Sequence, residues 1–77
     1  MNIKDVIELV ERHIADPESV GREELRAAYA AAAYAWDDAA DSAASAASAA
    51  LNGDTATAEY WVAEYHKSLI SDLNHRG

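Results

Sequence analysis

The stretch Ala27–Ala50 reads AAYAAAAYAWDDAADSAASAASAA, and 15 of its 24 residues are alanine. Alanine has the highest helix propensity of all residues, and the stretch contains no Val, Ile or Thr. A disordered low-complexity segment is the alternative, but alanine is not among the residues enriched in disordered chains. The stretch therefore predicts a helix, and the rest of the fold has to be arranged around it.

Signals on both sides of this stretch set the bounds of the expected central helix. Gly21 is an acceptable N-cap, so the helix is expected over 22–51. Asn52 and Gly53 then end it, because an Asn-Gly pair is typical of a left-handed C-terminal cap. Such a helix would be about 45 Å long at 1.5 Å per residue.

Two shorter helices are expected beside the central one. Asn2 can cap a helix over 3–15, which ends before Pro17 because the residue preceding a proline avoids the helical region. After the central helix, a third one is expected over 55–73. The short connection between the last two makes them antiparallel neighbours. The pattern predicts an all-α fold, either a three-helix bundle or a helical hairpin.

Length and composition bound the class of protein. Seventy-seven residues make one domain, 1–77. There is no cysteine, which excludes disulfides and thiolate metal sites and fits a cytoplasmic location. No apolar run approaches the roughly 20 residues of a membrane span. The N-terminus is charged and amphipathic, so no signal peptide is expected.

The charge of the chain is unevenly distributed. The formal net charge is −8, and the range 27–66 holds six acids and no Lys or Arg. Binding to nucleic acid phosphates requires clustered Lys and Arg, so no direct nucleic acid contact is expected. The negative electrostatic field of such a chain favours a protein partner with a basic surface. The alternative is that the charge only keeps the protein soluble.

Helical periodicity separates a core face from an outer face. At 100° per residue, the large apolar side chains of each expected helix gather on one side. The expected core residues are Ile7, Val10, Leu25, Tyr29, Trp36, Trp61, Tyr65 and Leu69.

The opposite side of the expected central helix carries Tyr34 beside three acids, Asp37, Asp38 and Asp41. An aromatic side chain in an acid-rimmed surface is a candidate contact site, although exposed aromatics are common and a solvated face is the alternative. In the last helix, Tyr60 and Ile70 lie off the main apolar stripe. Either this last helix is packed on two sides, or Ile70 meets another copy of the chain. The second is favoured, as a homodimer or higher homo-oligomer, because few large apolar residues serve three helices.

Candidate residues for chemistry are few. The serines sit beside alanines inside expected helices, with no strand-turn-helix elbow around them. Glu11 and His13 are two residues apart and diverge, His66 has no ligand four residues away, and His75 lies in the C-terminal tail, so no metal site is expected. The acids at 37–41 lie in mid-helix and lack the irregular loop that calcium requires. No cofactor is expected, and the protein is expected not to be an enzyme.

The segments HIADPESV (13–20), EELRAAYAAAAYAW (23–36) and YWVAEYHK (60–67) resemble small alanine-rich helical proteins of phages and prophages. Some of those are immunity-like or anti-defence proteins, including anti-CRISPR-like ones. The resemblance implies a protein that acts by binding, such as one that covers the nucleic-acid-binding surface of a host complex inside a bacterial cell. It transfers no functional residue, because the group has no defining site motif.

The sequence therefore predicts a non-enzymatic inhibitor or adaptor that docks an acidic helical face on a basic partner. Two alternatives stay open. One is a self-associating helical scaffold, whose alanine faces pack on copies of itself. The other is an oligomeric sponge for a small ligand such as a nucleotide, with aromatic side chains between the protomers.

Overall fold

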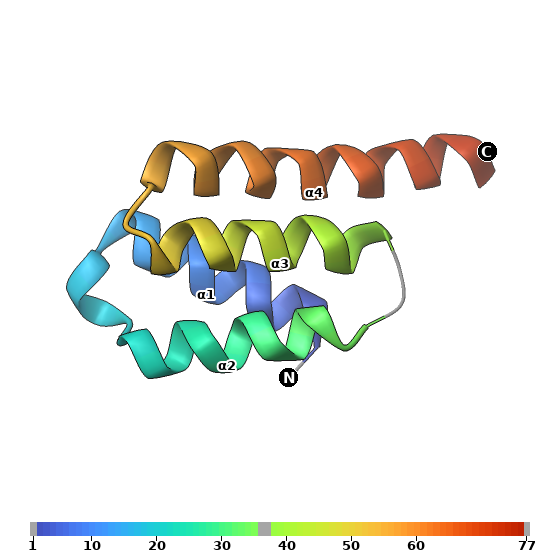
Figure 1. The fold of residues 1–77 in the computed structure, drawn as a ribbon. Helices are drawn as coiled ribbons and strands as arrows, with labels where there is room; N and C mark the ends of the chain where they lie inside the picture. Colours follow the sequence, from blue (N-terminus) through green and yellow to red (C-terminus); the bar gives the residue numbers. More distant parts are fainter. Residues whose placement is uncertain (1, 36–37, 77) are drawn as a thin grey trace.

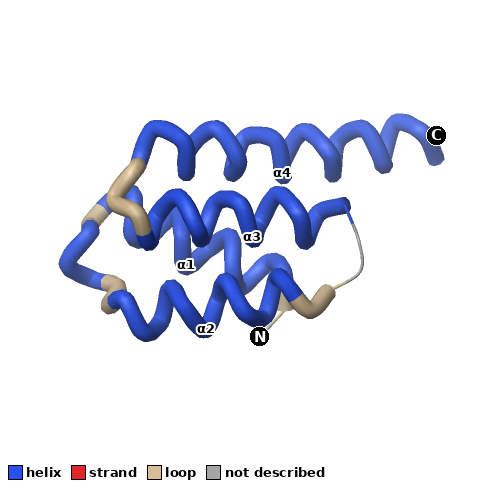
Figure 2. Tube along the Cα trace, viewed as in Figure 1, coloured by secondary structure: helices blue, strands red, loops and turns tan. Residues whose placement is uncertain are grey.

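The structure is a computed structural model that describes the backbone of residues 2–35 and 38–76 and the side chains of 2–35 and 39–70. This part of the chain contains the helices α1 (Ile3–Ala15), α2 (Arg22–Ala33), α3 (Asp38–Leu51) and α4 (Thr55–Arg76). A short 3-10 helix, η1 (Pro17–Ser19), joins α1 to α2. Figure 2 shows only helices and loops in the described ranges, which confirms the all-α fold.

The single long helix expected over 22–51 is wrong, because α2 ends at Ala33 and α3 begins at Asp38. Neither glycine nor proline marks this break. Aspartate is a poor residue for a helix interior and a favourable one in a first turn, and Asp38 opens α3. The break also lets the alanines of α2 and α3 pack on each other, which one straight helix would not allow.

The other helix ends follow the capping chemistry of the sequence. The backbone N–H of Asp5 donates to Asn2 Oδ1 over 2.8 Å, and the Asn2 N–H reaches the Asp5 carboxylate over 3.4 Å. At the end of α3, Gly53 has a φ of 75°. The N–H groups of Gly53 and Asp54 donate to Ala50 and Ala49 over 3.1 and 2.9 Å. This is the Schellman pairing, and it turns the chain directly into α4.

The helices form a layer with one helix behind it. In Figure 1, α2, α3 and α4 run side by side with α3 in the middle, and α1 crosses behind α3. Within the described ranges α3 packs against all three other helices, whereas α2 and α4 do not touch each other. The opposite face of α3, turned away from α1, has no helix over it. The C-terminal part of α4 extends past the first turn of α3.

The core is built mainly from alanine. Ala28, Ala32, Ala43, Ala46, Ala47 and Ala58 are each no more than 1% exposed. Branched side chains from α1, from the turn after η1 and from α2 fill the space against them: Val6, Ile7, Val10, Val20 and Leu25. Small side chains allow helix axes to approach more closely than the usual 8–10 Å, so α3 can be enclosed from three sides.

The structure places the expected core residues in three groups. Ile7, Val10, Leu25 and Tyr65 are buried, and Trp61 is partly buried against the core. Tyr29 and Leu69 need correction, because they are 42% and 41% exposed. Tyr29 lies on α2, which does not pack against α4, and Leu69 lies in the C-terminal half of α4. Trp36 lies outside the described residues.

No helix in the part of the chain that the structure describes combines the length and the apolar character needed to cross a bilayer.

Candidate functional site

A groove lies over the uncovered face of α3. Its volume is about 490 Å³, which lies within the 300–1,000 Å³ of ordinary ligand sites. We call it the α3 groove. The described residues that line it are Tyr29, Asp41, Ala44, Ser45, Ser48, Ala49, Asn52, Asp54, Thr57 and Trp61.

The floor of the α3 groove is one stripe of the α3 helix. Residues three or four positions apart share a helix face, and Asp41, Ser45, Ser48 and Asn52 follow this spacing. None of the floor residues between Asp41 and Asn52 is larger than serine. The groove is therefore open to solvent, and α3 has no long side chain to fill it.

The sides of the α3 groove are aromatic and come from different helices. Tyr29 stands on α2 and Trp61 on α4, on either side of α3. Trp61 is partly buried against the core and is held by Tyr60, whose ring meets it edge to face with 5.2 Å between the centroids. Tyr29, at 42% exposed, leaves its ring open to the groove. The groove thus has a partly buried aromatic side chain, Trp61, on one side and a more exposed one, Tyr29, on the other.

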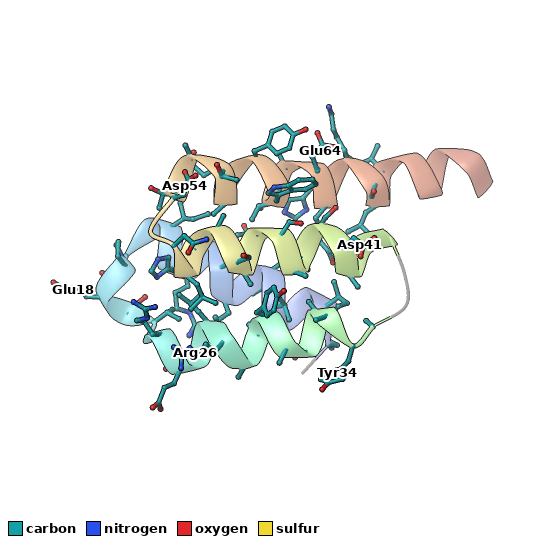
Figure 3. The ribbon with its side chains drawn as sticks, viewed as in Figure 1. Glu18, Arg26, Tyr34, Asp41, Asp54 and Glu64 are labelled. Atoms are coloured by element: carbon teal, nitrogen blue, oxygen red, sulfur yellow. The ribbon has the colours of Figure 1, made fainter. Side chains whose placement is uncertain are left out.

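Two carboxylates give the α3 groove its charge. Figure 3 shows Asp41 and Asp54 toward opposite ends of α3. None of the described lining residues is Lys or Arg. The Asn52 end of the groove also lies at the C-terminus of α3, where the helix dipole is negative. The groove therefore attracts cations along its whole length.

The two carboxylates differ in how they are held. Asp54 caps α4: it accepts from the Thr57 hydroxyl over 2.6 Å and from the Thr57 backbone N–H over 3.1 Å. These hydrogen bonds, led by the one from the hydroxyl, hold the pKa of the Asp54 carboxyl below its ordinary value of 3.8. Asp41 is exposed, and no side chain or backbone group of the described residues pairs with its carboxylate. Asp41 is thus free to bind a ligand, whereas Asp54 contributes a fixed charge.

The groove offers hydrogen-bond acceptors and aromatic faces but no general base other than carboxylates. Neither histidine nor lysine is among its described lining residues, so Ser45 and Ser48 have no imidazole or amine to activate them. Within the described ranges, no three His, Asp or Glu side chains gather closely enough to hold a metal ion. The arrangement is suited to binding a cationic group.

The residues expected to bind a partner do not form one surface. Asp41 lines the α3 groove, but Tyr34 ends α2 and is 83% exposed (Figure 3), outside that groove. The expectation that they share one helix face is wrong because the helix breaks between them. Asp38 opens α3, while its side chain and the whole of Asp37 lie outside the described residues.

The expected contact residues of α4 are both on the surface. Tyr60 is 56% exposed and Ile70 is 58% exposed. Ile70 lies one turn beyond His66, which lines a second, smaller hollow between α1 and α4. This hollow is mostly apolar, with Ile14, Ala15, Val62 and Ala63, and is bridged by His66 Nε2 and Glu11 Oε1 at 3.6 Å.

Three residues of the α3 groove were not expected there from the sequence. The sequence pattern places Tyr29 and Trp61 in the core, and it does not mark Asp54 as a binding residue. Their meeting depends on α2 folding back beside α3, which the helical periodicity of 22–51 does not reveal. The available signal was the spacing of Asp41, Ser45, Ser48 and Asn52, which marks a polar stripe on an otherwise alanine helix.

Comparison of the chain with protein-family models, with curated proteins and with solved structures gives no match.

Proposed function

We propose that this protein is a non-catalytic binding protein that docks the α3 groove on a basic surface of a protein partner. The α3 groove is the observation that carries the proposal. It joins two carboxylates and two aromatic side chains around a floor of small residues, and its described lining holds no cation. Interfaces are typically anchored by aromatic side chains in a desolvated centre and oriented by complementary charge.

The proposal is tested by capturing a partner from a bacterial lysate with wild-type protein and then measuring the affinity of that partner for two variants. Asp41→Asn removes the unpaired carboxylate of the groove. Glu18→Gln removes one charge from η1, away from the groove (Figure 3). Asp41→Asn should weaken binding roughly fivefold, corresponding to about 1 kcal/mol for an exposed pair, and Glu18→Gln should not.

Salt dependence gives a second readout of the same proposal. Binding between an acidic groove and a basic surface weakens as ionic strength shortens the Debye length. The Asp41→Asn variant should then show a smaller salt dependence than wild type. Equal affinities of both variants, together with salt-independent binding, would exclude the acidic groove as the docking surface.

The resemblance to phage proteins suggests which basic surface is bound. We propose an anti-defence, anti-CRISPR-like inhibitor that acts in the cytoplasm of a bacterial host and covers the nucleic-acid-binding surface of a defence complex. Expression in a CRISPR-immune strain should restore plaques of a targeted phage, and Asp41→Lys should reduce that restoration. Unchanged immunity over a panel of CRISPR types would contradict this role while leaving the binding proposal intact.

Self-association through α4 is a second candidate, favoured by the exposure of Leu69 and Ile70 at 41% and 58%. Both belong to the C-terminal half of α4, a helix that extends past the first turn of α3 (Figure 1). Sizing with light scattering should give a mass above one chain, and Ile70→Glu should return it to a monomer. A wild-type monomer at micromolar concentration would exclude both the scaffold and the oligomeric sponge.

The two carboxylates of the α3 groove also disfavour the binding of an anionic nucleotide in that groove.

A further inference from the structure

We infer that the α3 groove recognises an arginine side chain of its partner, in preference to lysine. The inference rests on the proposed docking function and specifies its chemistry. It follows from what the groove holds besides negative charge: a free carboxylate, neutral acceptors and aromatic faces around an apolar patch of floor.

The hydrogen-bond acceptors of the groove match the planar set of N–H donors of an arginine side chain. A guanidinium carries five N–H donors in one plane, and a carboxylate can accept two of them at once. Asp41 is not engaged by any other group of the described chain. The hydroxyls of Ser45 and Ser48 follow it along the floor and can accept further donors. A compact ammonium has only three donors and would leave more of these acceptors unused.

The aromatic sides favour the same group. A guanidinium stacks on aromatic faces and is less strongly hydrated than an ammonium. Tyr29 and Trp61 border the groove from opposite sides, so two aromatic side chains are available to a planar cation above α3. Between them, Ala44 and Ala49 give an apolar floor for the methylene groups of the arginine.

Asp54 contributes to the negative electrostatic potential of the groove but does not bind the ligand itself. Both of its carboxylate oxygens accept hydrogen bonds from Thr57, so its charge is fixed at the far end of the groove from Asp41 (Figure 3). It also offsets the positive end of the α4 dipole, which would otherwise repel a cation there. The strongest site for the guanidinium is therefore beside Asp41.

The test is a titration of the protein with N-acetyl-arginine amide and with N-acetyl-lysine amide, which carry the same charge. Backbone and indole N–H signals are followed by NMR. The Trp61 indole signal is assigned with a Trp36→Phe variant. The arginine derivative should give saturable shifts at Trp61, Ser45 and Ser48, with an affinity roughly two- to fivefold higher than that of the lysine derivative.

Matched variants separate the groove from the general charge of the protein. Tyr29→Leu and Asp41→Asn should each weaken arginine binding and reduce its advantage over lysine. Tyr34→Leu removes an equally aromatic side chain, 83% exposed and outside the groove, and Glu18→Gln removes an equal charge. Both controls should leave arginine binding unchanged, and circular dichroism checks that every variant is folded.

Equal affinities for the two derivatives would overturn the arginine preference and leave general electrostatic docking in place. Linear, unsaturable shifts spread over all the acidic residues would overturn the groove as the site. Neither result bears on whether a captured partner distinguishes Asp41→Asn from Glu18→Gln, so failure of this inference is distinct from failure of the proposed function.

Discussion

At the scale of single residues, the size of the α3 side chains decides the structure. Ala43, Ala46 and Ala47 are completely buried, although each contributes only a methyl group. Their contribution is to permit close approach of the neighbouring helices, whose larger side chains then make the apolar contacts. Protein interiors are packed about as densely as organic crystals, so such positions have no room for a longer side chain.

Ala47→Leu should therefore destabilise the fold, even though leucine is more apolar and almost as good a helix former. Forcing extra methylene groups into a packed core typically costs about 1–3 kcal/mol. Ala30→Leu is the matched control, because Ala30 is exposed on α2, where the change should stay within about 0.5 kcal/mol. Urea unfolding of both variants measures the difference. Equal stabilities would show that α3 is not closely packed.

Asp54 should make part of the stability depend on pH. Its pKa in the folded protein lies below the ordinary value of 3.8 because it accepts hydrogen bonds from Thr57. A group of this kind stabilises the fold above its unfolded pKa, and the contribution is lost as pH falls through the folded pKa. Wild-type stability should thus drop on acidification below about pH 5.

Asp54→Asn keeps an acceptor for Thr57 but cannot titrate, so its stability should fall less steeply over the same range. Asp41→Asn is the matched control, since no described group donates a hydrogen bond to that carboxylate. Urea midpoints at several pH values provide the comparison. An identical acid profile for Asp54→Asn and wild type would contradict the role of Asp54.

At the scale of helices, the sequence predicts most of the ends but misses the decisive break. Asn2 and Gly53 mark helix ends by local chemistry, and the structure has the expected bonds at both. The break between Ala33 and Asp38 is marked by neither glycine nor proline, and the aspartate that opens α3 is a weaker signal than a cap. It gains its stability from tertiary packing of Ala28 and Ala32 in a common core with α3, and packing of this kind overrides helix propensity.

The hairpin of α2 and α3 can be tested by a distance. One continuous helix would separate residues 23 and 52 by about 44 Å, more than the 40 Å longest extent of the folded chain. In the hairpin, the start of α2 lies near the end of α3 (Figure 1). The chain has no cysteine, so spin labels at Glu23→Cys and Asn52→Cys report one distance by pulsed EPR. A single distribution near 44 Å would refute the hairpin.

The same break explains how much of the α3 groove was predictable. The exposure of Asp41 is predictable, because its charge and spacing are local properties of the sequence; its role as a partner contact stays a prediction. The position of Tyr29 opposite Trp61 was not predictable, because it depends on which helices lie beside α3. For the same reason the expectation of one helix face shared by Tyr34 and Asp41 is wrong.

At the scale of the whole molecule, α3 is the element on which the other helices depend. It contacts α1, α2 and α4, and α4 supplies Ala58, Val62 and Tyr65 to the common core. A chain of this length buries only about 60% of its unfolded surface, so it cannot lose one side of its central helix and remain stable.

A chain that ends at Gly53 should therefore lose cooperative unfolding, although its local helix propensity remains high. A chain that ends at Asn74 is the control and should unfold much like wild type, because it keeps those three α4 residues. Circular dichroism during a urea titration distinguishes the two. A sharp transition in the shorter chain would show that α1, α2 and α3 form an independent unit.

The serines of α3 stand at positions 42, 45 and 48, in a nearly regular Ser-Ala-Ala triplet. Three residues turn a helix by about 300°, so each serine is rotated about 60° from the one before, from buried Ser42 to Ser45 and Ser48 in the groove. Repetitive coding sequences tend to gain or lose whole units. Insertion of one more Ser-Ala-Ala unit into α3 would keep the reading frame and leave the amino-acid composition of the helix nearly the same. It would, however, rotate all later residues of α3 by about 60° against α1 and α2. The length of this helix should thus be conserved in evolution far more strictly than the identity of its exposed residues.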